Sequence, residues 1–337
     1  MEHSNSASAF AGLIDLVSEK NGGVTLLASD EFFAAKENLL KEGRGIFIPY
    51  KYTENGKWMD GWESRRKRVP GFDWCIIKPG VKGIIKGFDI DTNHFLGNHP
   101  PYASVEGCRL REDADVSFIS TDKIVWEEIL PMSPLNPGSQ NLFSCVSTKE
   151  WTHLKLNIFP DGGVARFRVY GEVNPGSIIK NEDGLSDLAA LINGGKVLIC
   201  NDMFFGSKDN LISTGRSLNM GDGWETKRKR IPGHDWVILK LAVTGKIKRI
   251  NVDTNFFKGN YPDRCSIEGC LLPDANDNTL ASAEIKWKEI LSETKLKGNF
   301  ENIFEKEINS TESFSHVRLN IFPDGGVSRI RLFGIPD

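Results

Sequence analysis

The strongest constraint on the fold is an internal duplication. The segment KLNIFPDGGVARFRVYG at residues 155–171 returns as RLNIFPDGGVSRIRLFG at residues 318–334, with 12 of 17 positions identical. This match predicts that one ancestral domain is present twice. A chain of 337 residues has room for two domains, and each could bury a core of its own.

Further matches follow in the same order in both halves. Three more pairs of segments correspond, namely 12–23 with 184–195, 29–33 with 201–205, and 89–108 with 251–270. The spacing is 172 residues early in the repeat and about 162 later, which indicates a loop shorter by ten residues in the second copy, opposite residues 34–58. We therefore expect a first repeat at 10–172, a Pro/Gly/polar linker at 173–183 and a second repeat at 184–335.

Each copy is predicted to be all-β. Leu154, Leu156 and Ile158 alternate with polar residues, the period of two expected of a half-buried strand. The PDGG that follows is typical of a tight turn. Many short strands with frequent turns favour a β-sandwich, of which a jelly roll is one form. Periodicity leaves the topology open, and short helical segments are expected only at 30–41 and 185–194.

Charge and hydropathy narrow the classes of partner. The formal net charge is −3 and the sequence pI is about 6.1, so no global field attracts nucleic acid or an anionic membrane. No apolar run approaches the roughly 20 residues that span a bilayer. We expect neither nucleic acid nor a membrane as a partner.

Cysteine usage indicates the compartment. The six cysteines form no CxxC pair, which is typical of reduced thiols in a cytosolic protein. The first residues also lack the charged and apolar regions of a signal peptide. We therefore expect a cytoplasmic location.

A basic turn occurs once in each copy. Residues 60–74 read DGWESRRKRVPGFDW, and residues 222–236 read DGWETKRKRIPGHDW. If this stretch is extended, Arg66 and Arg68 share one face, and arginine offers a planar fork that suits a carboxylate. The second copy has the same pair as Arg228 and Arg230.

A structural explanation of this turn is equally open. Arginines often stack on aromatic rings without binding a ligand, and Asp60 and Asp73 stand close enough in sequence to pair with them. In that case the basic turn would be a solvated strand.

A polar loop is the second shared feature. DTNHFLGNHP and DTNFFKGNYP each carry an Asp, a Thr and an Asn, at Asp91, Thr92 and Asn98 and at Asp253, Thr254 and Asn260. Loops on a rigid sandwich concentrate binding residues, and these side chains suit a small ligand rich in N–H groups. The alternative is that Asp and Asn cap their own turn.

No transition-metal site is predicted. His94 and His99 become Phe256 and Tyr261 in the second copy, so no zinc-type cluster is duplicated. An oxygen-ligand site for a loosely bound divalent metal stays open, and no other cofactor is expected.

These motifs together resemble the allantoicase family. The GWE block with its basic run, the DT-to-GN loop and IFPDGGV all occur twice, and the resemblance covers residues from about 10 to 335. It implies two tandem jelly-roll repeats of the galactose-binding-like type. It also implies hydrolysis of allantoate to ureidoglycolate and urea in purine degradation. The alternative is a non-catalytic carbohydrate- or small-ligand-binding jelly-roll module, because fold does not determine function.

The chemistry of allantoate suits the shared residues. Its carboxylate needs an arginine fork, its ureido groups need carboxylate or amide acceptors, and departure of urea needs positioned proton transfer. We predict catalytic roles for Glu63, Asp91, Glu225 and Asp253. We predict substrate binding by Arg66, Arg68, Thr92, Asn98, Arg228, Arg230, Thr254 and Asn260. Which carboxylate is acid and which is base stays open. We expect one functional site per chain, drawing mainly on one copy, and a homo-oligomer is left open.

Overall fold

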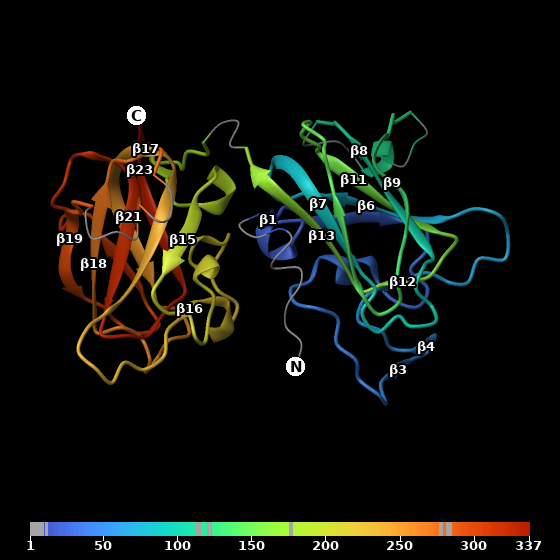
Figure 1. The fold of residues 1–337 in the computed structure, drawn as a ribbon, viewed down its shortest axis with the longest axis horizontal. Helices are drawn as coiled ribbons and strands as arrows, with labels where there is room; N and C mark the ends of the chain where they lie inside the picture. Colours follow the sequence, from blue (N-terminus) through green and yellow to red (C-terminus); the bar gives the residue numbers. More distant parts are fainter. Residues whose placement is uncertain are drawn as a thin grey trace. The chain divides into compact units, whose positions relative to one another are not determined.

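A computed structural model gives the fold, and its chain forms two compact units (Figure 1). We call Met1–Asn174 unit 1 and Pro175–Asp337 unit 2, and describe each by itself. The structure describes residues 10, 13–111, 116–119, 121, 123–174, 178–275, 279–280 and 285–337.

Unit 1 is a sandwich of two antiparallel sheets. One has the strand order β1-β13-β7-β10 and the other β2-β6-β11-β8-β9. The short strands β5 and β12 pair with each other, as do β3 and β4. The strands are β1 Ile14–Asp15, β2 Val24–Ala28, β3 Tyr52–Thr53, β4 Gly56–Lys57, β5 Trp62–Glu63, β6 Asp73–Lys78, β7 Gly83–Asp91, β8 Tyr102–Cys108, β9 Glu127–Pro134, β10 Gln140–Ser144, β11 His153–Phe159, β12 Gly163–Val164 and β13 Arg166–Val173.

Unit 2 repeats the arrangement. The order β14-β23-β17-β21-β18-β19 is completed by β15 and β20, which both pair with β17, and β16 pairs with β22. The strands are β14 Ser186–Asp187, β15 Lys196–Cys200, β16 Trp224–Glu225, β17 Asp235–Asp253, β18 Arg264–Cys270, β19 Lys288–Lys295, β20 Glu301–Phe304, β21 Ser313–Phe322, β22 Gly326–Val327 and β23 Arg329–Pro336.

One long strand in unit 2 replaces two strands of unit 1. The first half of β17 pairs with β15 and β21, and its second half pairs with β20 and β23. In unit 1 the same path is broken between β6 and β7 at Pro79-Gly80. Proline has no N–H for a ladder, whereas Leu241-Ala242 at the matching place in unit 2 can continue the strand. β17 therefore runs from one sheet into the other.

The predicted all-β jelly-roll sandwich is confirmed. Leu154, Leu156 and Ile158 are all fully buried, as their alternation predicts. The expectation of a half-buried strand is wrong, because His153 and Asn157 on the other face are buried too. The tryptophans that open the two basic turns, Trp62 and Trp224, are also fully buried. Each indole donates to a backbone carbonyl at 2.8 Å, so its polar atom is satisfied inside the core.

The predicted helical segments are shorter than expected. Within 30–41 only a 3-10 helix forms, and within 185–194 only one 3-10 turn. Asp30 accepts hydrogen bonds from the amides of Phe32 and Arg65, and such side-chain bonds compete with helix. The helical elements are η1 Glu19–Asn21, η2 Lys36–Leu40, α2 Val116–Ile119, η3 Leu191–Asn193, η4 Lys208–Ile212 and η5 Met220–Asp222.

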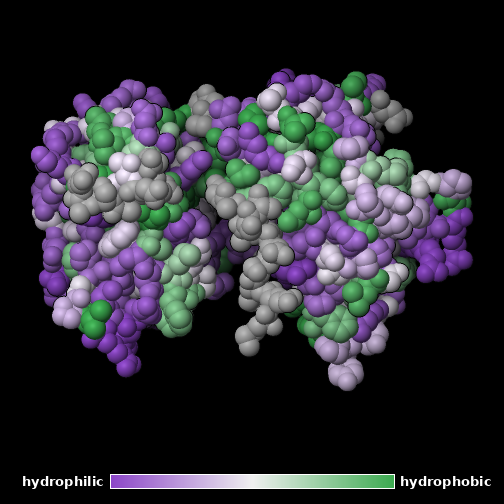
Figure 2. All heavy atoms as spheres, viewed as in Figure 1, coloured by the Kyte–Doolittle hydropathy of each residue, from purple (hydrophilic) through white to green (hydrophobic). Residues whose placement is uncertain are grey.

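The surface is mixed in character. On the face seen in Figure 2, hydrophilic residues in purple predominate, and hydrophobic residues in green occur among them. Among the described residues, none of the helices has the length and apolar character that a membrane span requires.

Candidate functional site

A carboxylate on β5 meets an amide from a distant loop. Glu63 forms a backbone bridge to Ala34 and lies opposite Gly163 of β12. The Asn98 Nδ2 donates to Glu63 Oε1 at 2.7 Å, and the Asn98 carbonyl accepts from the Gly163 N–H at 2.8 Å. The structure thus brings together two residues that the sequence placed in separate motifs.

Unit 2 has the same arrangement. The Asn260 Nδ2 donates to Glu225 Oε1 at 2.6 Å, and the Asn260 carbonyl accepts from the Gly326 N–H at 2.8 Å. We call Glu63 with Asn98, and Glu225 with Asn260, the Glu–Asn pairs.

The PDGG turns hold these loops in place. Gly162 has a φ of 137°, and a Cβ on it would come within 2.6 Å of the Asn98 carbonyl oxygen. Gly325 has the same φ, and its Cβ would lie 2.7 Å from the Asn260 carbonyl oxygen. Only glycine combines this backbone conformation with so close an approach.

Each Glu–Asn pair lines a cavity. In unit 1 the cavity has a volume of about 360 Å³, and its other lining residues are Phe33, Phe47, Lys57, Met59, His94, Leu96 and Gly97. In unit 2 the volume is about 550 Å³, and the other lining residues are Phe205, Thr226, Arg228, Gly259, Tyr261, Asp263, Pro323, Asp324 and Gly325. Both volumes fall in the range of small-molecule sites.

The two glutamates differ in burial. Glu63 is only 9% exposed, whereas Glu225 is half-buried. Burial raises the pKa of Glu63, and the hydrogen bond from Asn98 opposes that rise without cancelling it. A glutamate with a raised pKa holds its proton to higher pH than a free glutamate does, which suits a general acid.

The longer loop of unit 1 lines one side of its cavity. The β3–β4 hairpin lies in this loop, and Phe47, Lys57 and Met59 on it line the cavity. The Phe47 ring lies 5.5 Å from that of His94. In unit 2 the shorter connection carries only the turn η5. The length difference found in the sequence therefore falls directly beside the candidate site.

The predicted aspartates are held by arginines that the sequence analysis missed. Arg44 donates to both oxygens of Asp91, at 2.8 and 2.9 Å, and Asp91 is 2% exposed. Arg216 contacts Asp253 in the same way, at 3.2 and 3.4 Å. Arg44 and Arg216 share the 172-residue spacing of the early matches, a signal that could have revealed them.

These aspartates lie apart from the Glu–Asn pairs. Neither Asp91 nor Asp253 is among the described residues that line the two cavities. Arg44 satisfies both carboxylate oxygens of Asp91, so the geometry favours a role in holding the polar loop.

The predicted threonines are occupied by the backbone. Thr92 is fully buried, and its hydroxyl donates to the carbonyls of Asn136 and Ser139. Thr254 makes the equivalent bonds to Lys297 and Phe300. Neither threonine is among the described residues that line the two cavities, and the geometry of their hydrogen bonds indicates a structural role.

Alternate side chains of the basic turn have different surroundings. Arg65 pairs with Asp30 at 2.5 Å and Lys67 with Asp73 at 2.7 Å. Arg66 and Arg68 on the other face are exposed. The turn is therefore partly structural, as the alternative explanation allowed.

Of the predicted arginines, Arg228 reaches a cavity. It lines the cavity of unit 2, and Arg66, Arg68 and Arg230 are not among the described residues that line either cavity. Asp60, which the structural explanation paired with these arginines, forms its ion pair with Arg166 instead.

A hydrogen-bonded acid and amide occupy exchanged positions in the two units. The acid lies on β7 and the amide on β10 in unit 1, whereas the amide lies on β17 and the acid on β20 in unit 2. Gln140 donates to Asp89 Oδ2 at 2.7 Å in unit 1, whereas Asn251 donates to Glu301 at 3.0 Å in unit 2. Asp89 is 1% exposed, and among the described residues its Oδ1 has no hydrogen-bond partner. Burial raises the pKa of Asp89 to about 7.

The raised pKa of Asp89 predicts that the stability of unit 1 depends on pH. Asp89 binds its proton more tightly in the folded chain than in the unfolded chain. The free energy of unfolding should therefore fall from about pH 4 to the folded-state pKa of about 7, and then level off. Asp89→Asn should remove this fall and stabilise unit 1 at pH 8 by about 1–3 kcal/mol, the penalty of a buried unsatisfied group. Denaturant unfolding of both proteins at pH 5 and pH 8 measures the difference, and a variant less stable at pH 8 would contradict it.

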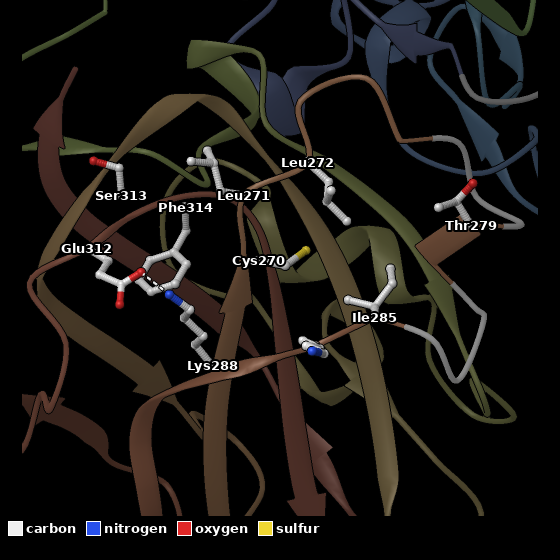
Figure 3. A pocket seen from close by; sticks show the side chains of 10 residues that line it. Cys270, Leu271, Leu272, Thr279, Ile285, Lys288, Glu312, Ser313 and Phe314 are labelled. Carbon is white, nitrogen blue, oxygen red and sulfur yellow. Dashed lines mark hydrogen bonds and ion pairs between the residues drawn. The ribbon is translucent and has the colours of Figure 1, made fainter.

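A third cavity lies apart from the Glu–Asn pairs. Within the described residues, no group of three His, Cys, Asp or Glu side chains could hold a metal ion. A further cavity of about 520 Å³ in unit 2 is lined by Cys270, Leu272, Ile285 and Phe314, and its Lys288 and Glu312 pair with each other (Figure 3). None of the predicted site residues is among those that line it.

The chain is similar to known proteins over nearly its full length. The allantoicase repeat family matches residues 14–174 and 186–337. An allantoicase of Dictyostelium discoideum is 48% identical over 96% of this chain and 87% of its own length. A probable allantoicase of Burkholderia mallei is 45% identical over 96% and 95%. The crystal structure of an allantoicase from Saccharomyces cerevisiae is 38% identical, covers 98% of this chain and 96% of its own, and has a TM-score of 0.81.

Proposed function

This chain belongs to the allantoicase family, and from that premise we propose that it hydrolyses allantoate to ureidoglycolate and urea. It is a hydrolase of linear amidine-type C–N bonds, acting in purine degradation. The observation that carries the site proposal is the Glu63–Asn98 pair, which lines a cavity and is repeated in unit 2.

The reaction needs one proton delivered and one removed. Allantoate carries a carboxylate and two ureido groups on one tetrahedral carbon. Hydrolysis breaks the bond from that carbon to one ureido nitrogen, which gains a proton and leaves as urea. Water supplies a hydroxyl to the carbon and releases a proton.

We assign the proton transfers to Glu63. Its burial and raised pKa favour the protonated form, which donates to the leaving nitrogen. The lone pair of the remaining ureido nitrogen assists the departure. The Glu63 carboxylate then takes a proton from the attacking water, so that one side chain serves first as acid and then as base.

Asn98 positions this acid and contacts the substrate. Its Nδ2 holds Glu63 Oε1, which leaves Oε2 to transfer the proton. The Asn98 amide oxygen is an acceptor suited to a ureido N–H. Asp91, held by Arg44, acts as a positioning residue for the loop that carries Asn98.

We propose that unit 1 carries the main site. Its cavity is the smaller of the two, and its glutamate is the more buried. Exclusion of water strengthens electrostatic interactions with a reacting group. Unit 2, whose glutamate is the less buried, is the weaker candidate.

Urea release is the direct test of the function. The purified protein, incubated with allantoate, should release one urea per allantoate consumed, with ureidoglycolate formed in equal amount, as followed by colorimetry and NMR. Binding of allantoate without urea release would support the non-catalytic binding module and overturn the proposal.

We also propose the organisation and location of the chain. Residues 10–172 and 184–335 are separate repeat domains joined by residues 173–183. Six free cysteines, five of them buried, suit the reducing cytoplasm.

A further inference from the structure

We propose that Lys57 binds the carboxylate of the substrate in unit 1 and thereby selects ureides that carry an acid group; this inference rests on the proposed function. Lys57 closes the β3–β4 hairpin. It lines the same cavity as Glu63 and Asn98. Because this hairpin lies in the loop that is shorter in unit 2, the residue could not be found by comparing the repeats.

The Lys57 ammonium is held in place without a counter-ion. Its Nζ lies 4.3 Å from the centroid of the Phe47 ring and 6.0 Å from that of Tyr52. The side chain is half-buried, and among the described residues no carboxylate forms an ion pair with it. Aromatic faces attract a cation but leave its hydrogen-bond donors free for an anion. Burying a charge without a partner costs free energy, so binding an anion stabilises a partly buried ammonium.

The predicted carboxylate-binding arginines are not placed to do this in unit 1. Arg66 and Arg68 are exposed and are not among the described residues that line this cavity. Lys57 is the lysine that does line it. A lysine binds a carboxylate as a point charge rather than as a fork.

The charge balance differs between the two cavities. The described lining of the unit 1 cavity has one carboxyl, Glu63, and one lysine. The described lining of the unit 2 cavity has Glu225, Asp263 and Asp324 against the single Arg228. An excess of carboxylates disfavours an anionic ligand. The allantoate anion is therefore favoured in the unit 1 cavity.

The test separates charge from shape. Lys57→Met keeps most of the apolar stem and removes the charge. It should raise KM for allantoate roughly 10- to 100-fold, the worth of a hydrogen bond to a charged group. The inhibition constant of N-carbamoylglycine, which has a carboxylate and one ureido group, should rise similarly. That of methylenediurea, which has two ureido groups and no carboxylate, should stay unchanged.

A matched control lies on the same loop. Lys51 is exposed, its Nζ lies 3.7 Å from the centroid of the Trp58 ring, and it is not among the residues that line the cavity. Lys51→Met should leave KM for allantoate within about twofold, well inside the tenfold step of 1.4 kcal/mol.

Three results would overturn the assignment. The first is an unchanged KM in Lys57→Met. The second is an inhibition constant of methylenediurea that rises as much as that of N-carbamoylglycine. The third is a rise in KM that occurs only in Arg228→Met. A wild-type protein that releases no urea would instead refute the proposed function. In that case calorimetric titration with allantoate still decides the role of Lys57: binding lost in Lys57→Met supports it, and absent or unchanged binding refutes it.

Discussion

Replacing Glu63 with glutamine should lower kcat for allantoate by roughly a hundredfold or more, the scale of a lost general acid. Glutamine keeps the shape of the side chain and can still accept the hydrogen bond from Asn98, but it has no proton to give to the leaving urea. The melting temperature should change little, because no buried ion pair is broken. In the wild type, kcat should fall as the pH rises through the raised pKa of Glu63, and this dependence should be absent from the residual activity of the variant.

The matched substitution in unit 2 separates one site from two. If unit 1 carries the main site, Glu225→Gln should retain most of the activity. A halving from each single substitution, with the remainder lost only in the double variant, would mean two independent sites. A large loss of activity in Glu225→Gln but not in Glu63→Gln would show that unit 2 carries the main site.

Replacing Arg166 with methionine should destabilise unit 1 by about 3–5 kcal/mol, the effect of leaving one partner of a buried ion pair uncompensated. The side chains of Arg166 and Asp60 are 4% and 8% exposed and lie 2.7 Å apart. Arg166 also donates to the Asp60 carbonyl, and Asp60 accepts from the Ile46 amide. Burial raises the pKa of Asp60, but the hydrogen bonds from Arg166 and Ile46 outweigh it and leave that pKa below its ordinary value.

This ion pair anchors the loop that lines the unit 1 cavity. Hydrogen exchange of residues 45–60 should therefore increase in Arg166→Met more than exchange elsewhere in unit 1. The double variant Asp60→Asn/Arg166→Met should recover part of the lost stability, since no unpaired charge remains. Unit 2 has the same pair in Arg329 and Asp222 at 2.8 Å, so Arg329→Met should act on unit 2 alone. If Arg166→Met and Arg329→Met were both as stable as the wild type, the anchoring role would be refuted.

The sequence by itself determined the duplication and the sandwich. Both are visible because repeated segments and a period of two are local properties, which do not depend on how distant strands pair. It also marked the residues of the Glu–Asn pairs, since each half of the chain keeps Glu63 or Glu225 and Asn98 or Asn260 at matching positions.

Only the tertiary structure decided which of the marked residues share a site. The meeting of Glu63 with Asn98 depends on β5 pairing with β12 and on the approach of Gly162 to the polar loop. The same packing lets Arg44 form an ion pair with Asp91, and lets the Thr92 hydroxyl donate a hydrogen bond to a backbone carbonyl. Such partners are set by sheet register and loop closure between residues far apart in the chain. Lys57 could not be marked in this way, because it stands in a segment without a repeat counterpart. Its place in the same cavity as Glu63 depends on how the loop with the β3–β4 hairpin folds.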